Sequence, residues 1–193
     1  MSEPTEEEKT SAAPAALVDQ LSAAGRRSRQ DAAHAIESIA RTSPELLLPH
    51  ADRLVEALGR PEAQTRWEVL STLSEMVQVD ADAVADAFEG AESSLFDEGS
   101  ATVRLAAFRF LARLGSTGAR MSDEVWPLLD EAVQCYHGDP EYRDMLACLL
   151  DFAHGELSEA TSQALAARVG FDAENGRGYI RSFSEQIVAG LDR

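Results

Sequence analysis

An arginine that recurs at nearly constant spacing constrains the fold more than any other feature of the sequence. Arg29, Arg66, Arg104 and Arg143 are separated by 37, 38 and 39 residues. Apolar residues follow each arginine four and seven positions later, namely Ala33, Leu70, Phe108 and Ala147, and then Ile36, Leu73, Leu111 and Leu150. A period of this length that contains two helices is typical of a helical solenoid.

The spacing of apolar residues is helical from Pro14 onward, and no segment alternates with the two-residue period of a strand. Residues 27–42, 61–79 and 100–115 each place their apolar side chains on one stripe of a helix. Proline and N-capping residues mark helix starts, and glycines such as Gly59 mark helix ends. The pattern predicts an all-α fold of about ten helices joined by short turns.

The repeats resemble those of HEAT-repeat proteins in the armadillo-like superfamily. In that family a turn of the type Asp-Pro-x-Val-Arg often opens the first helix of a repeat, and the sequences at 139–143 (DPEYR) and 102–104 (TVR) resemble it. The segment at 43–49 (SPELLLP) resembles the Pro-Glu step that often opens the second helix. The resemblance implies a right-handed α-α superhelix of about four helix pairs with terminal cap helices. It implies an architecture, not an activity.

The expected domain organisation follows from these repeats. We predict a disordered acidic tail over residues 1–13, which either solvates the chain or carries a docking motif. A single HEAT-like domain is expected over 14–193. Its repeats are placed at approximately 27–59, 61–98, 100–137 and 139–171, with cap helices at 14–25 and 174–190.

The repeat arginine has a structural interpretation. An arginine in the first turn of a helix lies at the positive end of the helix dipole, where its charge is unfavourable. We therefore expect Arg66, Arg104 and Arg143 to be held by a carboxylate or carbonyl oxygen, supplied by a neighbouring repeat. Contact with a ligand is the alternative.

No combination of residues predicts a metal or catalytic site. Some HEAT-like enzymes hold a di-iron centre with His-Glu pairs, but none of the four histidines here is followed by glutamate. Asp31 shares a helix face with His34, and Asp151 with His154, yet too few further ligands accompany either pair. We expect a non-catalytic protein with neither metal nor cofactor.

The two cysteines, Cys135 and Cys148, are too few for a disulfide framework and fit a reducing cytosol. We expect both to be small buried thiols. The sequence contains no apolar run of roughly 20 residues and no basic-then-apolar leader. These features predict a cytoplasmic location without contact to a membrane.

The chain is strongly acidic, with 17 Lys+Arg against 34 Asp+Glu and a formal net charge of −17. Nucleic acid and anionic membranes bind cationic surfaces, so neither is an expected partner. DNA-alkylation-repeat glycosylases resemble this chain in architecture but present a basic groove. Residues 61–100, in contrast, contain ten acidic residues and a single base, Arg66. We expect the partner to be a protein or peptide of basic character.

Acidic residues gather on the second helices of the second and third repeats, opposite the apolar stripes. In HEAT-like solenoids these second helices usually line the concave surface, and concave solenoid faces are binding surfaces. The predicted partner-binding residues are Asp82, Asp86, Glu89, Asp123, Glu124, Asp130 and Glu131.

Three alternatives stay open at the level of sequence. The acidity can reflect solubility or adaptation to salt instead of a binding site. The chain can be a regulatory subunit that docks into a larger assembly through an apolar face near Trp67, Phe96 or Trp126. A HEAT-like lyase-type enzyme is the third, although it would need a cluster of convergent polar residues. The oligomeric state is unknown.

Overall fold

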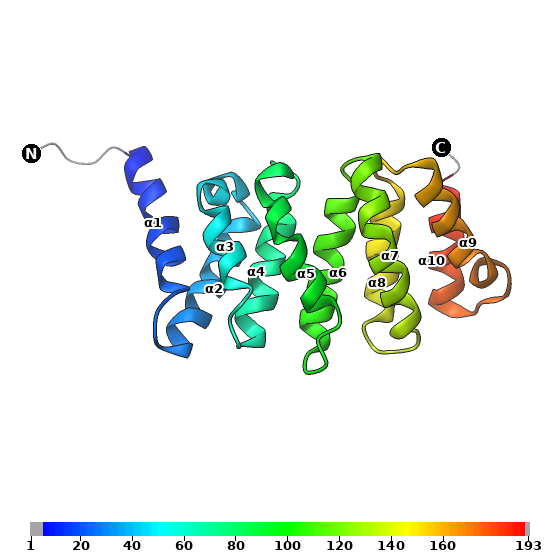
Figure 1. Ribbon diagram of the computed structural model, residues 1–193, viewed down its shortest axis with the longest axis horizontal. Helices are drawn as coiled ribbons and strands as arrows, with labels where there is room; N and C mark the ends of the chain where they lie inside the picture. Colours follow the sequence, from blue (N-terminus) through cyan, green and yellow to red (C-terminus); the bar gives the residue numbers. More distant parts are fainter. Residues whose placement is uncertain (1–5, 192–193) are drawn as a thin grey trace, which may run out of the picture. The chain divides into compact units, whose positions relative to one another are not determined.

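The computed structural model describes residues 6–191. Over this range it contains ten α-helices, two 3-10 helices and no strand (Figure 1). The prediction of an all-α fold is confirmed. The chain divides into two compact units, and the division falls between Ala91 and Glu92. The single HEAT-like domain over 14–193 stays a prediction.

The first unit stacks its helices in pairs. Helix α2 packs against both α1 and α4 (Figure 1). Helix α3 packs against η2, and α1 lies against η1. The elements of this unit are α1 (Glu6–Gln20), α2 (Arg26–Ala40), η1 (Pro44–His50), α3 (Ala51–Ala57), α4 (Ala63–Met76), η2 (Asp82–Ala87) and the first half of α5 (Phe88–Leu95).

Two details of the first unit differ from the sequence-based expectation. Helix α1 begins at Glu6, within the tail predicted to be disordered, while residues 1–5 lie outside the described range. Alanines on both sides of Pro14 favour a helix and explain this early start. The second helix of the first repeat begins as the 3-10 helix η1, because Pro49 has no N–H to donate to an α-helical hydrogen bond.

The second unit forms two layers. Helices α6, α8 and α10 follow one another in the first layer, and α7 packs against α9 in the second (Figure 1). Their bounds are α6 (Ala101–Gly115), α7 (Ala119–Cys135), α8 (Tyr142–Ala153), α9 (Glu159–Asn175) and α10 (Gly178–Leu191). Helix α9 continues past the repeat end expected at 171. Gly170 lies inside this helix, and a single glycine within a helix is tolerated at a cost of about 1 kcal/mol.

The core consists of the apolar stripes that the repeat pattern indicated. Those of α4 and α6 are buried, whereas Ile39 of the stripe in 27–42, and Ala147 and Leu150 of the repeat register, are only half-buried. The buried stripe residues are Val69, Leu70, Leu73 and Met76 of α4, Val77 directly after it, and Ala107, Phe108, Leu111 and Leu114 of α6.

Two of the repeat arginines link consecutive repeats. Arg29 of α2 forms an ion pair with Glu62, which precedes α4, and also donates to the carbonyl oxygen of Ala23 over 2.7 Å. Arg104 of α6 donates to Glu141 over 3.0 Å and to the carbonyl oxygen of Asp97 over 2.9 Å. Carboxylate and carbonyl together offset the unfavourable position of each arginine at its helix start.

The expectation for the repeat arginines is thus confirmed for Arg104, and Arg29 follows the same rule. The hydrogen bond from Arg29 lowers the pKa of the Glu62 carboxyl. Arg143 is different, because its side chain is exposed and no ion pair holds it within residues 6–191. The prediction was wrong for Arg143, where Arg104 already occupies the nearby carboxylate of Glu141.

Candidate functional site

Three of the predicted binding residues form an exposed strip on η2 and α5. Asp82, Asp86 and Glu89 follow one another by three or four positions and all are exposed. Val84 and Ala87, on the opposite side of the same segment, are fully buried. Within residues 6–191 none of the three carboxylates forms an ion pair. We call Asp82, Asp86 and Glu89 the η2–α5 acidic strip.

Asp123, at the start of α7, is held by side chains of α9. Its carboxylate accepts hydrogen bonds from the hydroxyls of Ser158 and Thr161, the latter over 2.8 Å. These two hydrogen bonds lower the pKa of Asp123. Ser158 also caps α9, because its Oγ accepts the backbone N–H of Thr161. Asp123 therefore has a structural partner and is less available to a ligand.

Asp130, two turns further along α7, is paired with Arg168 of α9. The guanidinium makes two hydrogen bonds to this carboxylate, one of them 2.8 Å long, and they raise the pKa of Arg168. Gln134 donates a third hydrogen bond to Asp130 over 2.9 Å. The negative charge of Asp130 is neutralised within the second unit.

Glu124 and Glu131, the two remaining predicted residues of α7, are exposed. Glu124 lies 4.0 Å from Arg120, a distance at which an exposed pair contributes little. Glu131 forms no ion pair in the described part of the chain. The seven predicted residues thus separate into the η2–α5 acidic strip, two exposed glutamates on α7, and two aspartates that join α7 to α9.

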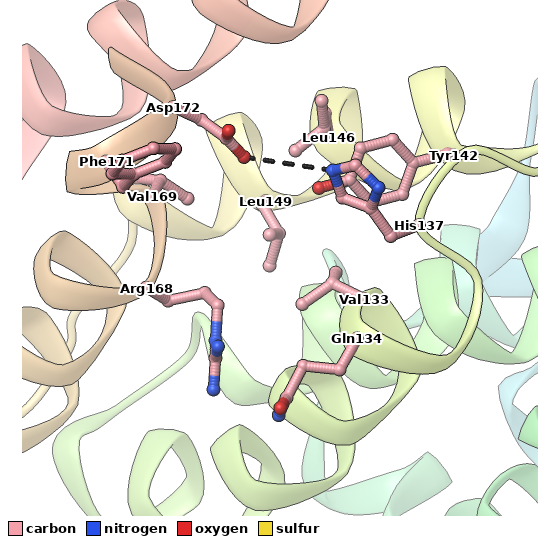
Figure 2. Close-up of a pocket in the computed structure, with 10 residues that line it drawn as sticks. All are labelled: Val133, Gln134, His137, Tyr142, Leu146, Leu149, Arg168, Val169, Phe171 and Asp172. Carbon is pink, nitrogen blue, oxygen red and sulfur yellow. Dashed lines mark ion pairs between the residues drawn. The ribbon is translucent and has the colours of Figure 1, made fainter. Parts of the chain in front are cut away.

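The second unit also contains a pocket that the sequence analysis missed. Its volume is about 360 Å³, and its walls come from the end of α7, the start of α8 and the second half of α9 (Figure 2). We call it the α7–α9 pocket. No signal in the sequence indicated it, because the lining residues come from three helices and the turn after α7, and only the packing of these segments brings them together.

Polar groups surround the mouth of this pocket. The imidazole of His137 lies 4.0 Å from the carboxylate of Asp172, as the dashed line in Figure 2 shows. The ring of His137 also contacts that of Tyr142, with centroids 4.7 Å apart. Burial raises the pKa of Tyr142 to about 12, so its hydroxyl stays protonated near neutral pH.

The remaining chemistry-bearing residues are dispersed. Cys148 is buried as expected, and burial raises the pKa of its thiol, but Cys135 is exposed at the last residue of α7. The prediction for Cys135 was wrong, because the helix end turns that position toward solvent. His34 faces Glu68 of α4 over 3.1 Å and not Asp31 of its own helix.

Among residues 6–191 no three His, Cys, Asp or Glu side chains gather in a way that could hold a metal ion. No helix in this range is both long and apolar enough to cross a membrane. The aromatic residues considered for an apolar docking face are largely enclosed. Trp126 is buried against Phe152, with ring centroids 6.3 Å apart, and Trp67 and Phe96 are half-buried.

Comparison with known proteins identifies the fold. No protein-family model matches the sequence, and no relative is found among curated proteins. Solved structures match over nearly the whole chain. One is a designed armadillo repeat protein in complex with the peptide (KR)4, with a TM-score of 0.76, 14% identity, and coverage of 93% of this chain and 82% of that one.

Two further structures agree with this result. Computationally designed armadillo repeat proteins for modular peptide recognition match with a TM-score of 0.74 and 14% identity, over 96% of this chain and 85% of theirs. An engineered protein matches with a TM-score of 0.72 and 15% identity, over 98% of this chain and 94% of its own. The chain has an armadillo/HEAT-like helical repeat fold, which confirms the resemblance drawn from the repeats.

Proposed function

We propose that this protein is a non-catalytic scaffold that binds a basic peptide segment of a partner protein, principally through the η2–α5 acidic strip. The observation that carries the proposal is the strip itself: three exposed carboxylates on one face, to which no cation is paired in the part of the chain that the structure describes. Solvated carboxylates without internal partners can exchange water for lysine or arginine at little cost. The exposed Glu124 and Glu131 of α7 add to the acidic surface of the second unit, whereas Asp123 and Asp130 contribute mainly to the packing of α9.

The spacing of the strip fits an extended peptide. A 3-10 helix rises about 2 Å per residue, so Asp82 and Asp86 are offset by about 8 Å along η2. Alternate residues of an extended chain point to the same side and lie roughly 7 Å apart. Lysines or arginines at every second position of a peptide can therefore face successive carboxylates.

The comparisons support a peptide as the ligand class. Proteins with this fold include designed scaffolds, one of which is bound to the alternating basic peptide (KR)4. Each exposed ion pair contributes at most about 1 kcal/mol, so binding of this kind depends on several pairs at once and weakens with salt. We place the protein in the reducing cytoplasm, because both cysteines are free thiols.

The test is a titration of fluorescently labelled (KR)4 followed by anisotropy. We expect the combined variant D82N/D86N/E89Q to bind about tenfold or more weakly than the wild type, with a flatter dependence of affinity on salt. A matched control is D31N/E45Q/D52N, which removes three exposed acidic residues of the same unit and gives the same net charge. Equal losses in both variants would mean that only overall charge attracts the peptide, and would reject the strip as the site.

A further inference from the structure

We propose that the α7–α9 pocket binds an apolar side chain of the partner segment, next to a lysine or arginine of that segment that pairs with Asp172. This inference rests on the proposed function in taking a basic peptide as the ligand. It adds a second site, in the other unit of the chain, and a sequence requirement that the acidic strip does not impose.

The interior of the pocket is apolar. Leu146 and Leu149 of α8 form its floor, and Val133 and Val169 approach from α7 and α9 (Figure 2). Its volume of about 360 Å³ lies at the lower end of the range for ligand sites, roughly 300–1,000 Å³. A space of this size and lining suits one large aliphatic or aromatic side chain, which would lose its contact with water there.

An exposed phenylalanine stands at the edge of the pocket. Phe171 of α9 is 73% exposed, more than any other large hydrophobic residue of the described range. Burial of an aromatic ring contributes a large favourable free energy. A ring exposed to water beside an apolar cavity is therefore typical of an interaction site. An incoming side chain would be covered by the ring of Phe171 on one side and by the aliphatic floor on the other.

The charges at the rim determine which apolar segment fits. Arg168 is the cation of the lining, and Asp130 already neutralises it. Asp172 lies 4.0 Å from the imidazole of His137 and interacts electrostatically with Tyr142, and within residues 6–191 no arginine or lysine pairs with it. The carboxylate of Asp172 therefore complements a cation beside the buried side chain and disfavours an acidic one.

The proposal is tested with two octapeptides, KRKRKRKR and KRKLKRKR, measured by anisotropy against the same protein. We expect the leucine peptide to bind about three to ten times more tightly, although it carries one charge fewer. We expect the variant F171A to lose this preference while its melting temperature stays unchanged, because the ring makes few contacts in the folded chain. The control V79A shortens another exposed hydrophobic residue, in the first unit, and retains the preference.

A second measurement separates this proposal from the preceding one. In the D82N/D86N/E89Q background both peptides bind more weakly, but we expect the preference for leucine to persist. Equal affinities for the two peptides, or a preference that survives F171A, would overturn the pocket proposal while the acidic strip stands. Failure of both peptides to bind the wild type would overturn both proposals.

Discussion

At the scale of single residues, the links between repeats consist of ion pairs that are largely removed from solvent. The side chains of Arg104 and Glu141 are 14% and 5% exposed, and the guanidinium also lies 4.7 Å from the centroid of the Tyr136 ring. A buried charge that loses its partner retains its desolvation cost without compensation. These links therefore fix the register of one repeat on the next.

The first prediction follows from this burial. Replacing Arg104 with alanine should lower the free energy of unfolding by about 3 kcal/mol, because Glu141 is left buried and the carbonyl oxygen of Asp97 loses its donor. The measurement is urea denaturation followed by circular dichroism. Arg143→Ala is the matched control, since this exposed repeat arginine should change stability by no more than about 0.5 kcal/mol. Equal effects of the two substitutions would contradict the structural role of Arg104.

The second prediction concerns the buried carboxyl of Glu68, which faces His34 and Gln64. Burial raises its pKa, with a smaller contribution from Glu37. The folded state therefore binds the proton more tightly than the unfolded state. Stability gained from this group is fully present below its unfolded pKa and is lost as the pH rises through the folded pKa.

Glu68→Gln should consequently be more stable than the wild type at pH 7, and the difference should shrink as the pH falls toward about 4.5. Unfolding free energies measured across this range check the sign. Glu45→Gln, an exposed change on η1, is the control for the loss of one negative charge. A difference that stays constant with pH would exclude ionisation of Glu68 as the cause.

The repeat register was sufficient to predict that Arg104 is held by an oxygen atom of a neighbouring repeat, but it did not identify Glu141 as the partner and it failed for Arg143. It did not reveal that His34 contacts Glu68 and not Asp31. Helical spacing permits both partners, and the decision depends on how α2 and α4 pack.

At the scale of helices, close contact between consecutive repeats depends on glycine at one turn. A Cβ atom added to Gly155 would collide with the backbone of Ser116, whose carbonyl oxygen accepts the N–H of Glu156 over 2.8 Å. Gly170, inside α9, has open space around the corresponding position. We therefore expect substitution by alanine to change the free energy of unfolding in opposite directions at these two glycines.

The third prediction is that Gly155→Ala lowers the free energy of unfolding by about 1–3 kcal/mol through the forced shift of the α6–α7 turn. Gly170→Ala should raise it by up to about 1 kcal/mol, because alanine has the higher helix propensity. Thermal and urea denaturation of both variants provide the comparison. Destabilisation by Gly170→Ala would contradict the open surroundings of this residue.

The positions of most helices could be predicted from the apolar periodicity and from the residues that begin and end helices. The type of helix, α or 3-10, could not be predicted. The apolar spacing of α4 and α6 is regular, and both stripes are buried. In η1 and η2 the chain adopts a 3-10 helix, whose three-residue period is too close to 3.6 to be distinguished over six or seven residues. The pattern also placed the start of α1 too late, because short alanine-rich segments give little apolar periodicity.

At the scale of the whole molecule, the repeat fold was predictable and the site was predictable only in part. Charge counting identified the acidic helices, and the η2–α5 acidic strip is exposed as expected. It could not show that Asp123 and Asp130 are engaged by Ser158 and Arg168, because those partners lie 35 and 38 residues away. The α7–α9 pocket depends on the packing of three helices and has no local signature.

The fourth prediction separates a binding surface from acidity that serves solubility alone. A net charge of −17 repels itself, so the melting temperature without any ligand should rise between low and moderate salt. The peptide complex should respond in the opposite direction, because salt screens the attraction between (KR)4 and the strip. Differential scanning fluorimetry with and without peptide records both. Stabilisation by peptide that does not decline with salt would argue against an electrostatic site.

The most direct test of the central claim is the map of amide chemical-shift changes when (KR)4 is added to 15N-labelled protein. The account predicts that the largest changes fall on η2 and α5 around Asp82, Asp86 and Glu89, and that they disappear in D82N/D86N/E89Q. The opposite result would be changes of similar size on all acidic helices, including the exposed acidic residues of α2 and η1. This result would contradict a defined site and would mean that only the overall negative charge attracts the peptide.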